Sequence, residues 1–239
     1  MRKRELCSLT LCAALLTIPP GVTAGCGGQE EKPSGSPSQT RLPGRVDPDV
    51  LRTTLPPAPG GTGDVTAAKK RVGETPGSRQ LYLLGLAYYK AGDYPSAVTQ
   101  LTAAAARAPK QPGPVFYLAY SHVGAGDLVA AEAAFVRLTT FPLPEKDLAR
   151  TYQEIGWCRW QARDAEAARG AFLKSLSYEP GNYWASYRLG LLESERGDQA
   201  EAARHLGAAV RAAESPVERR AAEAALARIS AATMPSPTP

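Results

Sequence analysis

The chain has 239 residues, of which 44% are hydrophobic and 21% are charged, so it is long enough for one globular domain with extensions. These values exclude a disordered polyelectrolyte. The formal net charge is +5, but the first five residues hold three basic and one acidic side chain, and the remainder carries only +3. Because the remaining charges of both signs are interspersed, no basic stripe is available for phosphate groups, and we expect no nucleic-acid partner.

The N-terminus has the pattern of a secretory signal peptide. Basic residues in Met1–Glu5 precede a thirteen-residue apolar run, Leu6–Ile18, which ends at two prolines. A transmembrane helix needs about 20 apolar residues, so this run is too short to span a bilayer. We therefore expect export of the chain, with residues 1–25 as a removable leader.

The leader ends in Ala24-Gly25-Cys26, which resembles the lipobox of bacterial lipoproteins. The resemblance implies acylation of Cys26 by fatty acids such as palmitate and a membrane anchor at the new N-terminus. Thr23 departs from the pattern, in which a branched aliphatic residue is usual at this place. The alternative is cleavage after Ala24 by ordinary signal peptidase, which would release a secreted protein.

The residue after Cys26 bears on localisation, because lipoproteins retained in the inner membrane are associated with Asp at that place. Here it is Gly27. The resemblance therefore implies an outer-membrane lipoprotein that faces the periplasm in a diderm bacterium. In a monoderm cell the same signal implies the outer face of the cytoplasmic membrane.

Residues 26–77 have the composition of a linker. Eight Pro and nine Gly occur among the 51 residues from Gly27 to Gly77, a proportion that cannot bury enough apolar surface to fold. As a flexible chain this stretch has a root-mean-square span of about 40 Å. Val46–Leu55 and Asp64–Val72 are the two segments in it that favour short helices, and the second is a candidate cap for the domain that follows.

The remaining chain, residues 78–232, contains a repeat with a period of 34, followed by a frayed tail at 233–239. Each copy has a small residue where two helices approach, a Gly-Asp or Arg-Asp turn between them, and a small residue on the second helix. The first set is Gly85, Ala119, Gly156 and Gly190; the turns begin at Gly92, Gly126, Arg163 and Gly197; the last set is Ala97, Ala131, Ala168 and Ala202. We expect Leu101, Phe135, Phe172 and Leu206 to fill the space between units.

The third copy begins three residues late, which predicts a longer first helix after Phe141. The segment from Val217 to Ala232 has apolar residues at helical spacing and predicts a terminal capping helix. Hairpins of this size cannot bury their apolar faces alone, so the copies must stack.

These residues resemble the tetratricopeptide repeat (TPR), with Pro109 and Pro180 as its closing proline. The resemblance implies an all-α solenoid of about four helix hairpins. It also implies a concave groove lined by the first helix of each unit, and we expect its positions to lie outside the set that closes the hairpins. The residues at these positions are Tyr82, Leu86, Tyr89, Lys90, Phe116, Tyr120, Val123, Arg150, Gln153, Trp157, Trp160, Gln161, Trp184, Tyr187 and Leu191.

All three tryptophans fall on this predicted groove, which is typical of a recognition surface for an apolar peptide segment. Two alternatives stay open at this point. The capping segments could cover some of these rings, or the register could slip by one residue at the longer third helix.

No catalytic or metal-binding motif accompanies the repeats, and we expect neither an enzyme nor a cofactor. His122 and His205 have no ligand or nucleophile at a suitable spacing. Cys158 is the single cysteine outside the leader and Cys26, so no internal disulfide is available, and a buried thiol behaves as a small hydrophobe. The competing interpretation is a redox or enzymatic accessory factor that uses Cys158.

We interpret the chain as a membrane-anchored TPR scaffold that binds a protein segment in the bacterial cell envelope. The order of lipobox, linker and repeats resembles pilotin lipoproteins, whose partners are secretins and other components of pilus, secretion or motility complexes. A self-associating structural envelope protein is the third alternative.

Overall fold

The computed structural model describes residues 64–73 and 75–233, and all the regular secondary structure in this part of the chain is helical. The leader, Cys26 and the predicted helix at Val46–Leu55 lie outside the described residues. The helices are α2 (Val65–Lys70), α3 (Ser78–Ala91), α4 (Tyr94–Arg107), α5 (Pro112–Ala125), α6 (Leu128–Leu138), α7 (Glu145–Gln161), α8 (Ala165–Tyr178), α9 (Tyr183–Arg196), α10 (Gln199–Ala212) and α11 (Pro216–Thr233).

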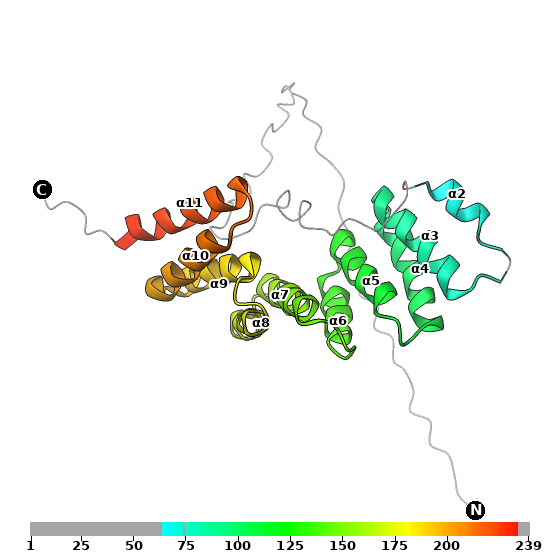
Figure 1. Ribbon diagram of the computed structural model, residues 1–239, viewed down its shortest axis with the longest axis horizontal. Helices are drawn as coiled ribbons and strands as arrows, with labels where there is room; N and C mark the ends of the chain where they lie inside the picture. The colour runs from blue at the N-terminus through cyan, green and yellow to red at the C-terminus, as the bar shows by residue number, and fades with distance from the viewer. Residues whose placement is uncertain (1–63, 74, 234–239) are drawn as a thin grey trace, which may run out of the picture. The chain divides into compact units, whose positions relative to one another are not determined.

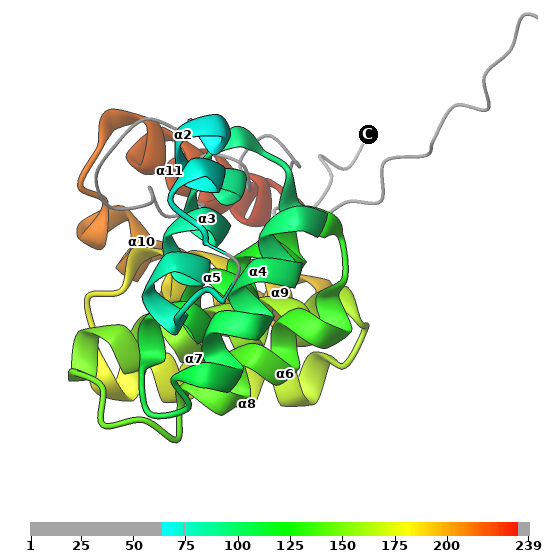
Figure 2. The same cartoon turned by 90° about the vertical axis from the view of Figure 1, so that its right-hand side faces the viewer.

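Helices α3 to α10 form four antiparallel hairpins, and each hairpin packs on the next one along the chain (Figure 1). We call them units 1 to 4, each with a first and a second helix. Figure 2 shows the stack from the end at which α2 and α3 lie. Helix α2 packs on α3, and α11 packs on α10 at the other end. The predicted all-α TPR-like solenoid with a terminal capping helix is confirmed.

The turns between paired helices follow the expected chemistry. Asp127 and its three counterparts are N-caps, and the Asp127 carboxylate accepts a hydrogen bond of 3.0 Å from the Ala130 backbone N–H. Gly126 ends α5 at φ +81°, a left-handed conformation that costs glycine little. Arg163 stands at the corresponding place in unit 3 with φ +67°. Unit 3 therefore adopts the same turn against the conformational preference of its residue.

Three glycines allow the close approach of the paired helices. A Cβ added to Gly156 would lie 2.7 Å from the Phe172 ring, and one added to Gly85 would lie 2.6 Å from Leu101. Leu101 and Phe172, which we expected to fill the space between units, therefore also close their own hairpins. Each packs against the glycine of its own hairpin, because the second helix turns this residue toward its partner helix.

The three extra residues of unit 3 extend its first helix, as predicted. Helix α7 has 17 residues, where the first helices of the other units have 14. Helix α6 is shorter than the other second helices, with 11 residues. A six-residue link from 139 to 144 separates α6 from α7 and changes the spacing between units 2 and 3.

The first helices lie on the inner side of the stack. Among the described helices, α3 approaches α5, α7 approaches α9, and α9 approaches α11 within 8 Å between Cα atoms, whereas no two successive second helices do. Helices α5 and α7 are also farther apart, at the junction that contains the longer link. We call the side formed by α3, α5, α7 and α9 the inner face, and the side formed by the second helices the outer face.

Candidate functional site

The inner face carries the predicted groove residues, but the structure divides them into two sets. Eight of the predicted positions are half-buried and reach the surface: Tyr82, Lys90, Phe116, Val123, Arg150, Trp184, Tyr187 and Leu191. Five others are buried: Leu86, Tyr89, Tyr120, Trp157 and Trp160. We expected all these side chains to lie apart from the residues that pack the hairpins together. This expectation is wrong for the five buried ones. Gln153 is buried as well, and Gln161 is half-buried.

The five are covered from within their own hairpins as well as by neighbouring units: the Tyr120 ring lies edge-on to Phe135, and the Trp160 ring lies edge-on to Phe172. Trp157 is 3% exposed and Trp160 is 5% exposed, so both rings serve as core between units. The Trp160 indole N–H donates to Glu195 of unit 4 at 2.8 Å. Truncating Trp157 would therefore remove core packing, which typically costs about 3–5 kcal/mol of stability.

Units 1 and 2 meet through aromatic rings. The Tyr117 ring lies edge-on to Tyr89, with 5.4 Å between the centroids, and edge-on to Phe116 at 5.1 Å. Tyr82 is tilted against Tyr117 at 6.2 Å. Such pairs typically contribute about 0.5–1.5 kcal/mol each beyond the burial of their area. This end of the inner face is therefore closely packed and largely apolar.

Arg150 covers the junction between units 2 and 3. Its guanidinium lies 5.8 Å from the Phe116 ring centroid and 5.7 Å from that of Tyr120, and its Nε donates to the Tyr120 hydroxyl at 3.1 Å. Burial, together with the nearby Glu154 carboxylate, holds the pKa of Tyr120 well above its usual range. The hydroxyl therefore stays protonated and can donate to Glu154.

Glu154 lies at the centre of a buried polar network. Its carboxylate accepts from the Tyr120 hydroxyl at 3.5 Å, from Gln153 Nε2 at 3.0 Å and from Arg188 Nη1 at 3.4 Å. The side chain of Arg188 is fully buried, and that of Glu154 is 7% exposed. Arg188 also stacks between two rings, 5.8 Å from Trp157 and 5.5 Å from Trp184.

The repeat pattern alone did not single out Glu154 or Arg188. The two residues are 34 positions apart and occupy the same place in successive first helices, where unit 2 has the buried Tyr117. The sequence did contain a signal for this pair, because two opposite charges occupy equivalent repeat positions on an otherwise apolar face. Their burial depends on the distance between helices, which the repeat pattern does not specify.

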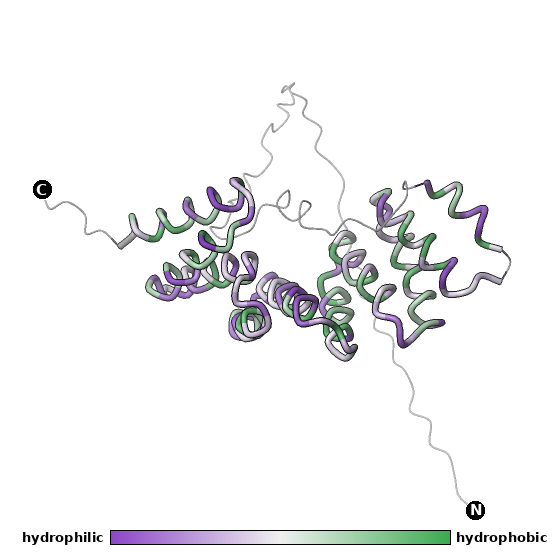
Figure 3. The backbone as a smooth tube through the Cα atoms, viewed as in Figure 1, coloured by the Kyte–Doolittle hydropathy of each residue, from purple (hydrophilic) through white to green (hydrophobic). Residues whose placement is uncertain are grey.

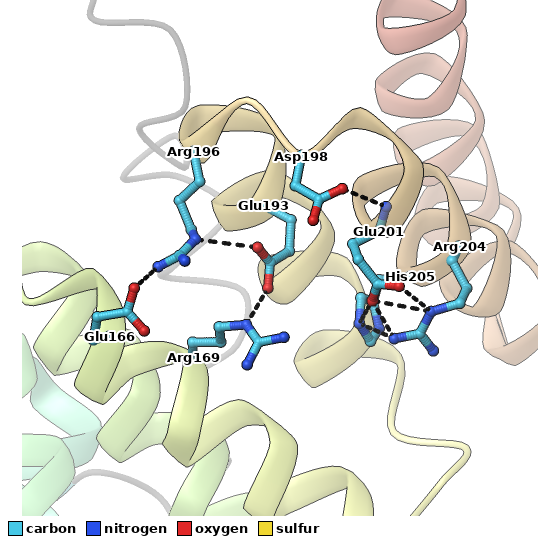
Figure 4. A network of polar contacts seen from close by, with 8 residues as sticks. All are labelled: Glu166, Arg169, Glu193, Arg196, Asp198, Glu201, Arg204 and His205. Carbon is cyan, nitrogen blue, oxygen red and sulfur yellow. Dashed lines mark hydrogen bonds and ion pairs between the residues drawn. The ribbon is translucent and has the colours of Figure 1, made fainter.

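A second set of ion pairs joins units 3 and 4 on the side shown in Figure 4. Arg169 of α8 donates to the buried Glu193 at 2.6 Å, and Arg196 pairs with both Glu193 and Glu166. Beyond this group, Glu201 and Arg204 contact His205 on α10. Charged side chains therefore bridge successive units on both sides of this half of the stack.

Cys158 and His205 are buried, and His122 is half-buried. Cys158 is 1% exposed, and burial followed by the nearby Glu154 and Glu132 raises the pKa of its thiol far above the usual range. Burial also lowers the pKa values of His122 and His205. In the described part of the chain, no three His, Cys, Asp or Glu side chains are grouped to hold a metal ion. No helix there combines the length and apolar character needed to cross a bilayer.

The first half of the repeat array matches a known family. Residues 82–142, which cover most of units 1 and 2 and the start of the link after them, match the tetratricopeptide repeat family model. The fold is a TPR-like solenoid. A search among curated proteins gives no significant match.

Solved structures share the fold at low sequence identity. A crystal structure of MamA superposes with a TM-score of 0.57 and 21% identity, over 62% of this chain and 85% of MamA. TTC0263, a TPR protein of Thermus thermophilus, gives a TM-score of 0.52 and 19% identity, over 68% of this chain and 89% of the other. The APC/C hetero-tetramer Cut9–Hcn1 gives 0.53 and 17% identity, over 63% and 30%. At these identities the likeness concerns the fold alone.

Proposed function

We propose that the protein is a non-catalytic scaffold whose inner face binds a segment of another protein. The observation that carries the proposal is the row of half-buried aromatic and basic side chains from Phe116 through Arg150 to Trp184 and Tyr187. Large rings that stay partly exposed are typical anchors of protein interfaces. TPR arrays hold protein partners elsewhere, and the Cut9–Hcn1 structure with this fold is a hetero-tetramer.

We further propose that the scaffold acts in the bacterial cell envelope. The support is the sequence of the leader, Cys26 and the Pro/Gly-rich linker. With a lipid on Cys26, the linker would allow the repeats to reach about 40 Å from an outer membrane. A pilotin-like role, in which the segment belongs to a secretin or to another secretion or motility component, fits this arrangement.

The competing interpretations receive less support. A redox or enzymatic role for Cys158 needs an accessible thiolate, and burial disfavours both access and ionisation. Self-association through the inner face is the alternative that uses the same surface. Size-exclusion chromatography with light scattering distinguishes it, because self-association through this face would give a dimer that Trp184→Ala dissociates.

The experiment for partner binding compares one inner and one outer substitution. Wild type, Trp184→Ala and Arg204→Glu are each crosslinked in membranes, and the proteins recovered with them are quantified by mass spectrometry. We expect Trp184→Ala to lower recovery of the partner about 30-fold, which corresponds to about 2 kcal/mol for a lost aromatic anchor. Arg204→Glu on the outer face should leave recovery unchanged. The opposite pattern would assign binding to the outer face.

The anchor has its own test. Cys26→Ala should move the protein from the detergent phase to the aqueous phase in a phase-partition assay, because it removes the acylated side chain. A mature N-terminus at Gly25 with a free Cys26 thiol would overturn the lipid proposal and leave the binding proposal unaffected.

A further inference from the structure

Arg188 has hydrogen-bond donors that the described structure does not satisfy. Nη1 binds Glu154, but Nε and Nη2 are buried without a hydrogen-bond partner. The indole N–H of Trp157, whose ring stacks on the same guanidinium, is also buried without one. Leaving a buried donor unpaired typically costs about 1–3 kcal/mol. Three unpaired donors on two side chains in contact indicate a binding site for a hydrogen-bond acceptor.

The two free nitrogens of Arg188 identify the kind of acceptor. Nε and Nη2 lie along one edge of the planar guanidinium and point their N–H groups in parallel. This edge matches the two oxygens of a carboxylate, which it binds through two parallel charge-assisted hydrogen bonds. A hydroxyl or a single carbonyl would satisfy only part of the edge.

The charges around the site also favour an anion. Two guanidinium groups, Arg150 and Arg188, share the buried network with one carboxylate, Glu154. Asp147 also acts on Arg150, but it is exposed and screened by solvent. A second carboxylate would balance the network without a new unpaired charge.

Given the proposed function, on which this step rests, we infer that the bound segment inserts an acidic side chain, Asp or Glu, onto the Nε–Nη2 edge of Arg188. The half-buried Trp184 ring lies against Arg188, with its centroid 5.5 Å from the guanidinium carbon. Because the edge is buried, this ring must move aside when the segment binds. The segment thus combines apolar anchors with one acidic residue.

The first arm of the test needs no partner. The Nε–H resonances of Arg188 and of the exposed Arg211 are followed by NMR in the full-length chain while acetate replaces chloride at constant ionic strength. We expect a saturable shift at Arg188, with a half-saturation about tenfold lower than at Arg211, since charge-assisted pairs exceed about 1.4 kcal/mol. An unmoved Arg188 resonance would overturn the inference.

The second arm identifies the source of the carboxylate. A random peptide library is selected on the full-length chain, and each acidic residue of the recovered peptides is replaced by its amide. One replacement should weaken binding about tenfold to the wild type and less than about twofold to Arg188→Lys, which keeps a cation beside Glu154 but loses the fork. The matched Arg211→Lys should behave as wild type. Peptides that bind without an acidic residue would contradict the inference, whereas an empty selection would contradict the proposed function and leave the acetate result to decide the site.

Discussion

Units 1 and 2 are joined by aromatic rings, whereas units 3 and 4 combine apolar packing with buried charges. Figure 3 shows long apolar stretches on α4 to α6 and more hydrophilic colouring over α7 to α10. Of the buried polar or charged side chains in the described residues, Ser121 alone belongs to units 1 and 2. The buried charges Glu154, Arg188 and Glu193 all lie in the other half.

This difference teaches that one repeat fold tolerates two kinds of interface. The small residues and turns that close each hairpin are alike in both halves, so the hairpin geometry does not depend on the interface. The family model matches the apolar half, residues 82–142. A buried ion pair adds little net stability over apolar packing. The polar half therefore suits recognition, because its buried donors can be used by a ligand.

The largest expected effect comes from removing one partner of the buried pair. Arg188→Met should lower the free energy of unfolding by roughly 3–5 kcal/mol, because it leaves the Glu154 carboxylate buried without its cation. The double variant Glu154→Met/Arg188→Met should recover most of this loss. Urea denaturation measures both, and a single variant within about 1 kcal/mol of wild type would show that the pair is not buried.

The next effect concerns hairpin closure, which should be independent of the interface type. Gly156→Ala should cost about 1–3 kcal/mol, since its Cβ would overlap the Phe172 ring. The control is Gly170→Ala in the neighbouring helix, where no atom lies within 4 Å of the new Cβ. There the substitution should stabilise the protein by about 0.5–1 kcal/mol. Thermal unfolding of the two variants should move in opposite directions.

Substitutions in the turns should change stability by a smaller amount, with opposite signs in unit 2 and unit 3. Gly126→Ala in unit 2 places a Cβ in the left-handed region and should cost about 1 kcal/mol. Arg163→Gly in unit 3 should gain a similar amount, because it removes the same strain. Equal destabilisation by both would mean that the Arg163 side chain makes a contact that outweighs its backbone conformation.

The smallest effect is a pH dependence from His205 in the polar half. Burial, and then Arg204, lower its pKa below the usual 6.5; Glu201 and Glu193 oppose this shift, and Arg169 adds to it weakly. The folded state therefore binds the proton less well than the unfolded state. Stability should fall as the pH drops below about 6.5 through the folded pKa. His205→Gln should flatten this part of the stability curve, measured by denaturation at several pH values.

Much of the fold could be predicted because it depends on local patterns. The period of 34, the Gly-Asp turns and the late start of the third copy predicted the hairpins and the longer α7. The burial of Trp157 and Trp160 could not be predicted in this way. The repeat position of a residue determines which way its side chain points from the helix, but not the distance to the neighbouring helix. The Glu154–Arg188 pair needed that distance as well. The repeat pattern therefore predicted which face carries these residues, whereas the structure was needed to show which of them are buried and which reach the surface.

The most direct test of the central claim is to map which face of the stack touches the partner. A photo-reactive phenylalanine analogue replaces Tyr187 or Phe116 on the inner face, and Val129 or Val136 on the outer face, in cells that contain the full-length chain. Both outer side chains are exposed, at 82% and 42%, so accessibility does not favour the inner positions. Binding through the inner face predicts crosslinks to another protein from Tyr187 and Phe116 only. Crosslinks from Val129 and Val136, with none from the inner positions, would contradict it.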